Sequence, residues 1–543
     1  MLTTLRLVPS SSRPLRRIAV ALAVFALAGC SLDEGAGPRV PVVKPGNPGA
    51  QAQDGASPGP VPPGLERFYR QQVKWEPCGP YATTDSDEAS FQNAELQCTR
   101  VEVPVDYANP AGRTARLGVL RRAAEDPGVR VGSLLINPGG PGGSGMSTAA
   151  SLSDSVAGTE LGQRFDLIGF DPRGIGASEP KVLCRTTAEQ DAERLDLDLD
   201  TSPAGVAQTE KEEQEYAALC SQRVGNDVLA NSGTRDVARD MDVLRAVLGD
   251  AQLSYLGYSY GTRIGTEYAK QFPRNVRAMV LDGALDPDED LVDSLVNQGA
   301  GFQKSFDAFI KWCAEQPKCW LGDTPKEQAN QKFQETLRPL TTQAMPVGNR
   351  KLSYTDATTG AVQALYSDQL WPLLDQGLTE LAAGDGSTLL TLADVYYQRG
   401  ERGYSGSEDA FVAVRCLDDP PVNDPAKVLE ADRRYRAAAP FLDDGNPPSA
   451  ARDACSFWPV PPTGEPGEPK VDGLTRVLVV STTGDPATPY EAGVELARQL
   501  DAYLLSFSGN QHTVALQGVT CVDQAVADYL IRLELPKNDR CRA

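Results

Sequence analysis

Residues 253–269 read Leu-Ser-Tyr-Leu-Gly-Tyr-Ser-Tyr-Gly-Thr-Arg-Ile-Gly-Thr-Glu-Tyr-Ala, and this stretch decides the fold. Its first residues form a short apolar run typical of a buried strand, and the part after Gly261 has the composition of a helix. Between them, Gly257 and Gly261 flank Ser259, and such glycines permit a tight, strained turn that exposes the serine hydroxyl at the carboxyl end of the strand. The stretch therefore predicts a strand, a sharp turn and a helix, with Ser259 as a candidate nucleophile.

Similar short apolar runs occur on both sides of this stretch and predict further buried strands. They are residues 133–137, 165–170, 278–281, 476–480 and 503–507. A helical pattern lies between two of them, with Thr234 as the expected N-cap and Gly249 as the stop. Continuous apolar strands that alternate with helices indicate a parallel sheet with helices on both faces, so the predicted fold class is α/β and doubly wound.

The composition divides the chain into five segments. They are residues 1–29, an export signal; 30–64, a flexible tether rich in Pro, Gly and Ala; 65–290, the first part of the α/β domain; 291–456, a large, mainly helical lid insertion; and 457–543, the C-terminal part of the α/β domain. In the fourth segment apolar residues recur at helical spacing, as at Phe302, Phe306 and Phe309. Strand character returns at Arg476, so the helical segment is expected to interrupt one continuous sheet.

The amino terminus resembles a bacterial lipoprotein signal. Arginines precede an apolar run from Ile18 to Ala28, which is far too short to span a membrane permanently. The run ends in Leu27-Ala28-Gly29-Cys30, which resembles the lipobox, where the chain is cut before a cysteine that is then lipidated. We therefore expect Cys30 to anchor the protein on the extracytoplasmic face of the cell membrane, with release to the cell wall or medium as a further option. An ordinary signal cut elsewhere is the alternative, and the general and twin-arginine export routes both stay open.

The composition is acidic, with 52 Lys and Arg against 73 Asp and Glu and a formal net charge of −21. This charge argues against a nucleic-acid partner and against docking of the folded part on an anionic surface. No stretch beyond the amino-terminal run approaches the length of an apolar membrane helix. We therefore expect membrane contact through the lipid anchor only.

Eleven cysteines occur in the chain, and ten remain besides Cys30. An even number in an exported chain indicates disulfides, and these ten fall into short sequential pairs. The suggested pairs are Cys78 with Cys98, Cys184 with Cys220, Cys313 with Cys319, Cys416 with Cys455, and Cys521 with Cys541. Zinc binding is the alternative, but the chain has no Cys-x-x-Cys and a single histidine, so no metal site is expected.

That single histidine is His512, in a stretch of loop composition after the expected last strand. A serine nucleophile needs a neighbouring base, and imidazole is the usual one because it titrates near neutral pH. The acid that orients the imidazole is expected to be Asp485, which follows the strand at residues 476–480. Asp282 is the competitor, because it lies just after the strand expected at residues 278–281, and strand ends of such a sheet point to one crevice. Strand position and spacing favour Asp485.

A glycine-rich loop follows the strand expected at residues 133–137, and residues 137–145 read Asn-Pro-Gly-Gly-Pro-Gly-Gly-Ser-Gly. Such glycines let backbone N–H groups turn toward a bound carbonyl oxygen. We expect an oxyanion hole formed by the N–H groups of Gly140, to within a residue, and of Tyr260, the residue after Ser259. A phosphate-binding loop is the alternative, but the Gly-Lys-Ser/Thr of such loops is missing. No organic cofactor is expected.

Several motifs together resemble the secreted tripeptidyl aminopeptidases of actinobacteria, relatives of prolyl aminopeptidases. They are the glycine-rich loop, Phe-Asp-Pro-Arg-Gly-Ile-Gly at 170–176, Gly-Tyr-Ser-Tyr-Gly-Thr at 257–262, Gly-Asp-Pro-Ala-Thr-Pro at 484–489 and Cys-Val-Asp at 521–523. The chain is similar in particular to mycobacterial cell-envelope lipoproteins of this family. The resemblance implies an α/β-hydrolase fold with a helical lid, a Ser-Asp-His triad, and a threonine, here Thr488, close to that triad. Pro138 stands where prolyl aminopeptidases usually have histidine, so strict proline specificity is not expected.

These features predict an exported serine peptidase that removes short peptides, expected to be tripeptides, from free amino termini through an acyl-enzyme. Its expected partner is a peptide or protein substrate with a free amino terminus. Acidic lid residues are expected to hold that cationic terminus, and the candidates are Asp286, Asp288, Glu289, Asp290, Asp418 and Asp419. The alternatives are a carboxylesterase or lipase with the same triad and, more remotely, a non-catalytic peptide-binding lipoprotein.

Overall fold

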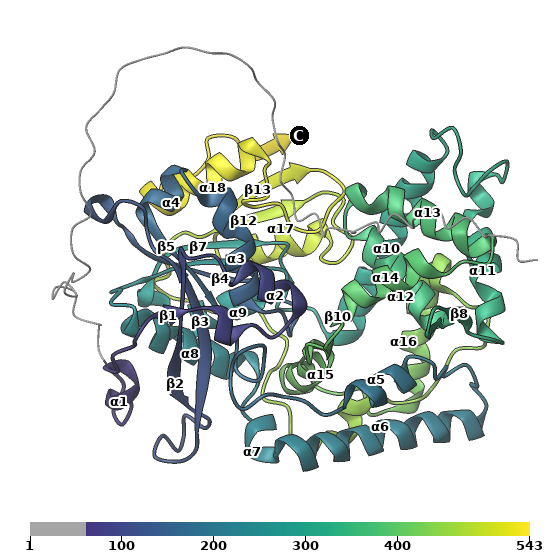
Figure 1. Cartoon of the computed structure of the whole chain (residues 1–543), viewed down its shortest axis with the longest axis horizontal. Helices are drawn as coiled ribbons and strands as arrows, with labels where there is room; N and C mark the ends of the chain where they lie inside the picture. Colours follow the sequence, from purple (N-terminus) through teal and green to yellow (C-terminus); the bar gives the residue numbers. More distant parts are fainter. Residues whose placement is uncertain (1–60, 543) are drawn as a thin grey trace, which may run out of the picture. The chain divides into compact units, whose positions relative to one another are not determined.

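The computed structural model describes residues 61–542, so Cys30 and the expected signal and anchor lie outside the described residues. Its centre is a ten-stranded sheet with the order β1-β2-β3-β5-β4-β6-β7-β12-β13-β14 (Figure 1). These strands are β1 (Glu76–Pro77), β2 (Leu96–Pro104), β3 (Thr114–Arg122), β4 (Gly132–Asn137), β5 (Phe165–Phe170), β6 (Leu253–Tyr258), β7 (Val276–Asp282), β12 (Leu478–Thr482), β13 (Tyr503–Ser508) and β14 (Arg540–Arg542).

The sheet is parallel from β5 to β14 and antiparallel from β1 to β5. Strand β6, which leads into Ser259, lies between β4, which leads into the glycine-rich loop, and β7, which ends at Asp282. Strand β12, which precedes Asp485, pairs with β7 on its other side. The carboxyl ends of these four strands therefore bring their loops to one edge of the sheet, as the α/β prediction requires.

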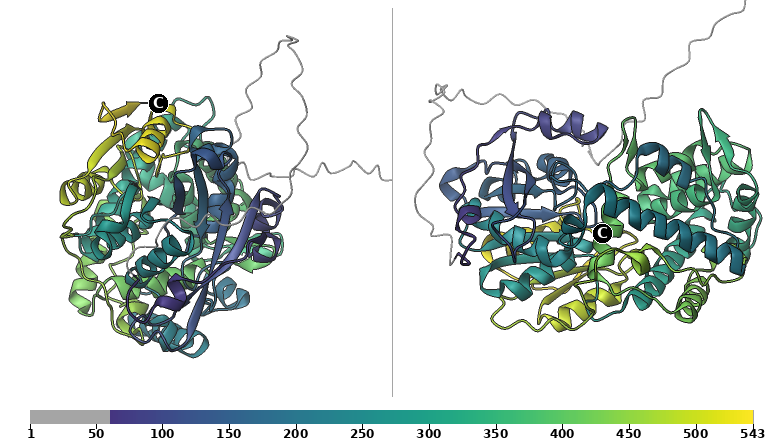
Figure 2. Two further views of the ribbon diagram at one scale, coloured as in Figure 1. Left: turned by 90° about the vertical axis from the view of Figure 1, so that its left-hand side faces the viewer. Right: turned by 90° about the horizontal axis from the view of Figure 1, so that it is seen from below.

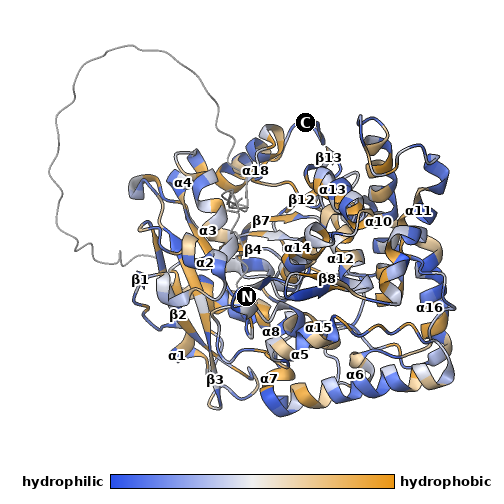
Figure 3. Cartoon of the chain, turned by 45° about the vertical axis from the view of Figure 1, so that its right-hand side comes forward, coloured by the Kyte–Doolittle hydropathy of each residue, from blue (hydrophilic) through white to orange (hydrophobic). Residues whose placement is uncertain are grey.

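Helices cover both faces of the sheet. On one face α8 and α9 pack against side chains such as Leu135, and on the other α3 and α18 pack against its neighbours Leu134 and Ile136. The strands in the centre are correspondingly apolar on both faces (Figure 3). The helices of this part are α1 (Glu66–Tyr69), α2 (Asp85–Ser90), α3 (Gly145–Val156), α4 (Glu160–Arg164), α8 (Thr234–Val247), α9 (Tyr260–Gln271), α17 (Tyr490–Gln499) and α18 (Thr520–Arg532).

A helical region interrupts the sheet between β7 and β12 and has an apolar core of its own. In this core the rings of Phe306 and Phe441 stack, and Phe333 contacts both at steeper angles. Its helices are α10 (Leu291–Cys313), α11 (Ala329–Leu337), α12 (Tyr354–Leu365), α13 (Trp371–Ala382), α14 (Ser387–Tyr396), α15 (Ser407–Asp418) and α16 (Pro425–Ala438). Two small hairpins accompany them, β8 (Met345–Val347) with β9 (Arg350–Leu352), and β10 (Arg399–Gly400) with β11 (Gly403–Tyr404).

A second segment packs onto this helical region, although its position in the sequence falls within the stretch assigned to the first part of the α/β domain. It comprises α5 (Thr187–Glu193), α6 (Pro203–Val224) and α7 (Asn226–Leu229). Beyond α5, buried Arg194 bonds Asp356 at 2.7 Å and Asp394 at 2.8 Å, both in the helical region. Figure 2 shows α6 crossing this region when it is seen from below. The lid is thus built from two separate segments of the chain, one containing α5 to α7 and the other containing α10 to α16.

Five disulfides join the cysteines in the suggested sequential pairs, which confirms that pairing. They are Cys78–Cys98, Cys184–Cys220, Cys313–Cys319, Cys416–Cys455 and Cys521–Cys541. The last of these ties the start of α18 to β14, the strand beside β13. Within residues 61–542, none of the helices combines the length and the apolar character that crossing a membrane requires.

Candidate active site

Ser259 occupies a sharp turn between β6, which ends at Tyr258, and α9, which begins at Tyr260. Its φ of 53° and ψ of −126° lie in a region that residues other than glycine rarely adopt. The strain is held by three hydrogen bonds: the Ser259 N–H donates to the carbonyl of Asp282 at 2.9 Å, and the Thr262 N–H and hydroxyl donate to the carbonyl of Ser259 at 2.8 and 2.7 Å. The turn thus has the strained conformation that the two flanking glycines predict.

The glycine-rich loop presses directly against this turn. A Cβ atom on Gly139 would lie 2.5 Å from the carbonyl oxygen of Tyr258 and 2.7 Å from the nitrogen of Tyr260, so only glycine fits. The Tyr260 N–H is the first of α9 and therefore has no partner inside the helix, and a helix N-terminus favours negative charge. The loop and the Tyr260 N–H therefore lie side by side, as an oxyanion hole would require. Gly140 follows Gly139, the residue that contacts Tyr260.

His512 contacts the acid that the sequence favoured. Its Nδ1 atom lies 2.9 Å from each carboxylate oxygen of Asp485, whose residue is 4% exposed. The Asp485 carboxylate also accepts hydrogen bonds from the N–H groups of Ala487 and Thr488, both at 2.9 Å. The Thr488 hydroxyl donates to Asp485 at 3.1 Å and lies 3.3 Å from Nδ1 of His512. A buried carboxylate is therefore fixed in orientation on one side of the imidazole, and Thr488 lies beside both.

Asp282, the competing acid, has a different set of contacts. Its fully buried carboxylate accepts hydrogen bonds from the N–H groups of Val514 and Ala515, both at 2.7 Å, and its backbone carbonyl receives the N–H of Ser259. Burial raises the pKa of Asp282 to about 7, although its two backbone donors and His512 act to lower it. Asp282 therefore fastens the histidine loop to the serine turn instead of orienting the imidazole.

Gly283, which follows Asp282, lies directly against the imidazole of His512 and the hydroxyl of Thr488. A Cβ atom on Gly283 would lie 3.2 Å from Cε1 of His512 and 3.1 Å from the hydroxyl oxygen of Thr488. In the part of the chain that the structure describes, no hydrogen bond joins the Ser259 hydroxyl to His512. In hydrolases without substrate this contact is often long and shortens when substrate binds.

The surroundings of His512 favour its protonated form. Burial lowers the pKa of His512, but the negative charge of Asp485, the hydrogen bond to Asp485 and the charge of Asp282 together raise it above the ordinary value of 6.5. An imidazole that is neutral above this pKa and stabilised when protonated can take the proton of a serine hydroxyl and later return it.

The lid contributes a contact that the sequence did not indicate. The backbone N–H of His512 donates a hydrogen bond to the backbone carbonyl of Tyr366 at 2.8 Å. The rings of the two residues meet edge to face with their centres 5.5 Å apart. The Asp368 N–H donates to the Asn510 carbonyl at 3.0 Å. The turn between α12 and α13 therefore clamps the histidine loop, a relation that no local sequence signal predicts.

Glu408 is a second lid residue that the sequence did not single out. It lies in the first turn of α15, whose residue Ser407 abuts the glycine-rich loop: a Cβ atom on Gly142 would lie 2.5 Å from the Ser407 carbonyl oxygen. Burial raises the pKa of Glu408 to about 7, and Arg185 acts to lower it. Burial raises the pKa of Tyr366 as well, and the charges of Asp485 and Glu408 both add to this. Within residues 61–542, no hydrogen bond or ion pair engages the Glu408 carboxylate.

Five of the six acidic residues predicted to hold a substrate amino terminus already have other partners. Asp418 is 3% exposed and bonds Thr234 and Tyr260, and Asp419 pairs with Arg263 at 2.9 Å. Three others accept hydrogen bonds: Asp286 from Gln499 and the N–H of Asp288, Glu289 from Asn297, and Asp290 from the N–H of Asp293. Asp288 is exposed, and within residues 61–542 its carboxylate has no hydrogen bond or ion pair. The carboxylates of Asp418 and Asp419 are thus already bound to α8 and α9 of the α/β domain.

Comparisons with known proteins agree with this geometry. A sequence model of the alpha/beta hydrolase fold matches residues 132–519. The chain is 44% identical over 471 residues to a serine protease, Hip1, of Mycobacterium tuberculosis, covering 85% of this chain and 89% of the relative. It is 45% identical over 507 residues to carboxylesterase B of the same species, covering 92% and 95%. It is 32% identical over 479 residues to a tripeptidyl aminopeptidase of Streptomyces coelicolor, covering 86% and 85%.

The family match includes the serine turn, the acid and the single histidine, and the relatives are named as serine protease, esterase and peptidase. The chain therefore belongs to the α/β-hydrolase fold family, as a serine hydrolase related to the tripeptidyl aminopeptidases.

Proposed function

We propose that the protein is a lipid-anchored serine peptidase that removes short peptides, preferentially tripeptides, from free amino termini. Ser259 attacks the scissile carbonyl, His512 takes the hydroxyl proton and passes it to the leaving amine, and Asp485 holds the imidazole. The Tyr260 N–H and a neighbouring N–H of the glycine-rich loop, at Gly140, stabilise the oxyanion. Water then releases the acyl-enzyme by the same route, with His512 again as the base.

The observation that carries the amino-terminal specificity is Glu408. A substrate ammonium group needs a carboxylate that is shielded from water and free of other partners, because an exposed or already paired acid contributes little to binding. Glu408 meets both conditions among the described residues. Its charge acts on Tyr366, whose pKa it raises, and the ring of Tyr366 contacts the ring of His512. The half-buried Glu408 carboxylate, with its pKa raised to about 7, becomes fully charged when an ammonium group binds beside it.

Wild-type protein should cleave a tripeptide amide with a free amino terminus much faster than its N-acetylated twin. Glu408→Gln should raise KM for the free-amine substrate about ten- to hundredfold, the value of one charged hydrogen bond, and leave the acetylated substrate unaffected. Steady-state kinetics on the two substrates measure both effects. Glu213→Gln is the matched control, because burial also raises the pKa of Glu213 to about 7 but this residue lies on α6, next to Asp453 and Asp198.

Equal turnover of the free and acetylated peptides, together with faster cleavage of simple esters, would instead support a carboxylesterase. The 45% identity to a carboxylesterase makes this the second candidate. An unchanged KM in Glu408→Gln would show that Glu408 does not bind the substrate amino terminus. The peptidase proposal itself would then be tested by comparing the free and acetylated peptides. Failure of a fluorophosphonate to label Ser259 would argue for a binding protein without catalysis.

The anchor is proposed from the sequence around Cys30, which precedes the described residues. A lipid on Cys30 would hold the enzyme on the extracytoplasmic face of the membrane, where peptides with free amino termini are its partners. Cys30→Ser should shift the protein from the membrane fraction to the medium, as measured by fractionation and mass spectrometry of the amino-terminal peptide. Retention of the variant in the membrane fraction would contradict lipid anchoring.

A further inference from the structure

Helix α15 of the lid connects two parts of the proposed oxyanion hole. At its amino-terminal end, the backbone of Ser407 lies against Gly142 of the glycine-rich loop. At its carboxyl end, the side chain of Asp418 accepts a hydrogen bond from the hydroxyl of Tyr260, the residue after Ser259. One rigid helix therefore contacts both segments that would supply oxyanion donors.

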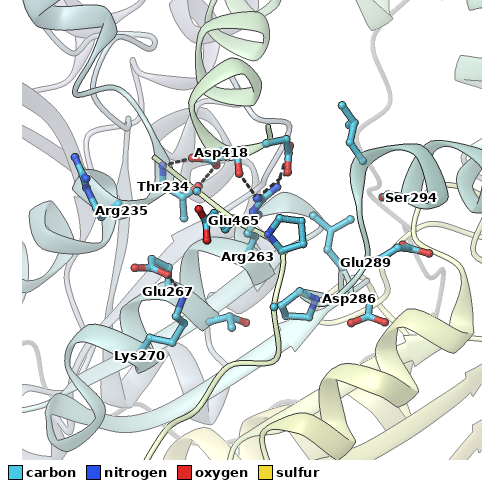
Figure 4. A pocket seen from close by; sticks show the side chains of 18 of the residues that line it. Thr234, Arg235, Arg263, Glu267, Lys270, Asp286, Glu289, Ser294, Asp418 and Glu465 are labelled. Carbon is cyan, nitrogen blue, oxygen red and sulfur yellow. Dashed lines mark hydrogen bonds and ion pairs between the residues drawn. The ribbon is translucent and has the colours of Figure 1, made fainter. Parts of the chain in front are cut away.

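Asp418 is almost completely enclosed by its partners. Its carboxylate accepts hydrogen bonds from the Thr234 N–H at 3.0 Å, from the Thr234 hydroxyl and from the Tyr260 hydroxyl, and its backbone carbonyl accepts one from Arg263 at 2.8 Å. Figure 4 shows Asp418 at the end of its helix, facing Thr234 and Arg263. The negative charge lies at the first N–H of α8, where a helix favours it.

This arrangement explains why Thr234 does not act as the N-cap that its sequence position suggested. The cap position is Gly233, and Thr234 is the first helical residue, with its hydroxyl directed to Asp418. The lid carboxylate thus replaces a local cap for α8 and at the same time holds the ring of Tyr260, the first residue of α9. Because the ring and the backbone N–H belong to the same residue, fixing the hydroxyl limits how far that N–H can move.

We propose that Asp418 is a positioning residue, which fixes Tyr260 through its hydroxyl and so aims the Tyr260 N–H at the oxyanion. The inference rests on the proposed roles of Ser259 and Tyr260 and adds a function for the lid: α15 completes the oxyanion hole from outside the α/β domain. Displacing Asp418 should weaken stabilisation of the tetrahedral intermediate without changing how the substrate is held in the ground state.

Two variants test this with p-nitrophenyl acetate and with a free tripeptide amide as substrates. Asp418→Asn and Tyr260→Phe should each lower kcat about 10- to 100-fold with KM within about twofold of wild type, less than the loss of a whole oxyanion donor. Affinity for a peptide boronic acid, which forms a tetrahedral adduct with Ser259, should fall by a similar factor. The double variant should be no worse than the poorer single variant, because both substitutions break the same link.

Asp356→Asn is the matched control, because Asp356 is also a buried lid aspartate, 1% exposed, that pairs with an arginine, Arg194, at 2.7 Å. It should lower the melting temperature and leave kcat unchanged. If Asp418→Asn does not fold, Tyr260→Phe decides alone, since it removes only a hydroxyl and leaves the backbone donor in place.

Wild-type kcat in Tyr260→Phe, a change confined to KM, or additive losses in the double variant would each overturn the proposal. Ester hydrolysis does not depend on amino-terminal specificity. If the wild-type protein cleaved the ester and not the peptide, the peptidase proposal would be refuted, but the ester kinetics of the variants would still test the role of Asp418. Labelling of Ser259 by a fluorophosphonate in every variant confirms that the nucleophile itself is intact.

Discussion

Replacing His512 with alanine is expected to reduce kcat by about 10⁴-fold or more, because the chain contains no other histidine that could take the serine proton. The variant should still fold. The contact that fastens this loop to the lid is made by the backbone N–H of residue 512, which alanine retains, and the Val514 and Ala515 N–H groups still reach Asp282. Steady-state turnover of an ester and a peptide, with the melting temperature as the folding readout, measures both expectations.

Gln511→Ala is the control for this loop. Gln511 precedes His512, and its side chain donates a hydrogen bond to the Thr513 carbonyl at 2.8 Å, so its loss disturbs the loop and spares the imidazole. That variant should keep kcat within about threefold of wild type, an effect of less than 1 kcal/mol. If His512→Ala kept more than about one hundredth of wild-type kcat, the imidazole could not be the general base, since a triad member removed alone costs far more.

The central sheet and the site residues on it could be predicted because their signals are local. The apolar run before Ser259 lies on β6 as expected, and the strand ends carrying Asp282 and Asp485 reach the same edge. Strands β2 and β3 were not among the expected strands. Their charged residues, such as Arg100 and Glu102, interrupt the apolar run because side chains along these antiparallel strands alternate between the core and a more exposed face.

The choice between Asp485 and Asp282 illustrates what a strand pattern leaves undecided. Asp282 is the last residue of β7, whereas Asp485 follows the end of β12 at Thr482, and both lie at the same edge of the sheet. Strand position and spacing favoured Asp485 but did not exclude Asp282. The two acids differ in their hydrogen-bond partners. The Asp485 carboxylate contacts Nδ1 of His512, whereas the Asp282 carboxylate accepts hydrogen bonds from two backbone N–H groups that follow His512 in the chain. These contacts depend on how the histidine loop folds back over β7, which no spacing in the sequence encodes.

The lid residues could not be assigned from composition because their roles depend on tertiary packing. Glu408 lies in the first turn of α15 and Asp418 is its last residue. Within residues 61–542 the half-buried Glu408 carboxylate has no hydrogen bond or ion pair, whereas Asp418 is enclosed by Thr234 and Tyr260. In the sequence each is the first of two adjacent acids, Glu408-Asp409 and Asp418-Asp419, in an acidic chain, and nothing local separates their roles. The acids that were predicted, such as Asp286 and Asp290, lie in a turn-rich stretch where nearby N–H groups and side chains already occupy them.

Asp485→Asn is expected to lower kcat by about 10⁴-fold and to move the acid limb of the pH–rate profile to lower pH. The sign follows from the causes of the His512 pKa. Burial lowers that pKa, and the charge and hydrogen bond of Asp485 outweigh burial and raise it above 6.5, so activity is lost as pH falls through the raised value. An asparagine has no charge, so the imidazole stays neutral to lower pH, but its orientation and the stabilisation of its protonated form are lost. Rates measured from about pH 5 to 9 record both effects.

Asp282→Asn separates this prediction from a general effect of removing a buried acid near the histidine. Asp282 also raises the pKa of His512, and burial raises the pKa of Asp282 itself to about 7, so the variant should simplify the acid limb and move it slightly to lower pH. Its kcat should fall by no more than roughly tenfold, the value of one hydrogen bond, because its contacts hold a loop and do not orient the imidazole. Equal losses in the two variants would mean that Asp485 acts only by shaping the loop, whereas a difference of about a thousandfold assigns the catalytic orientation to Asp485.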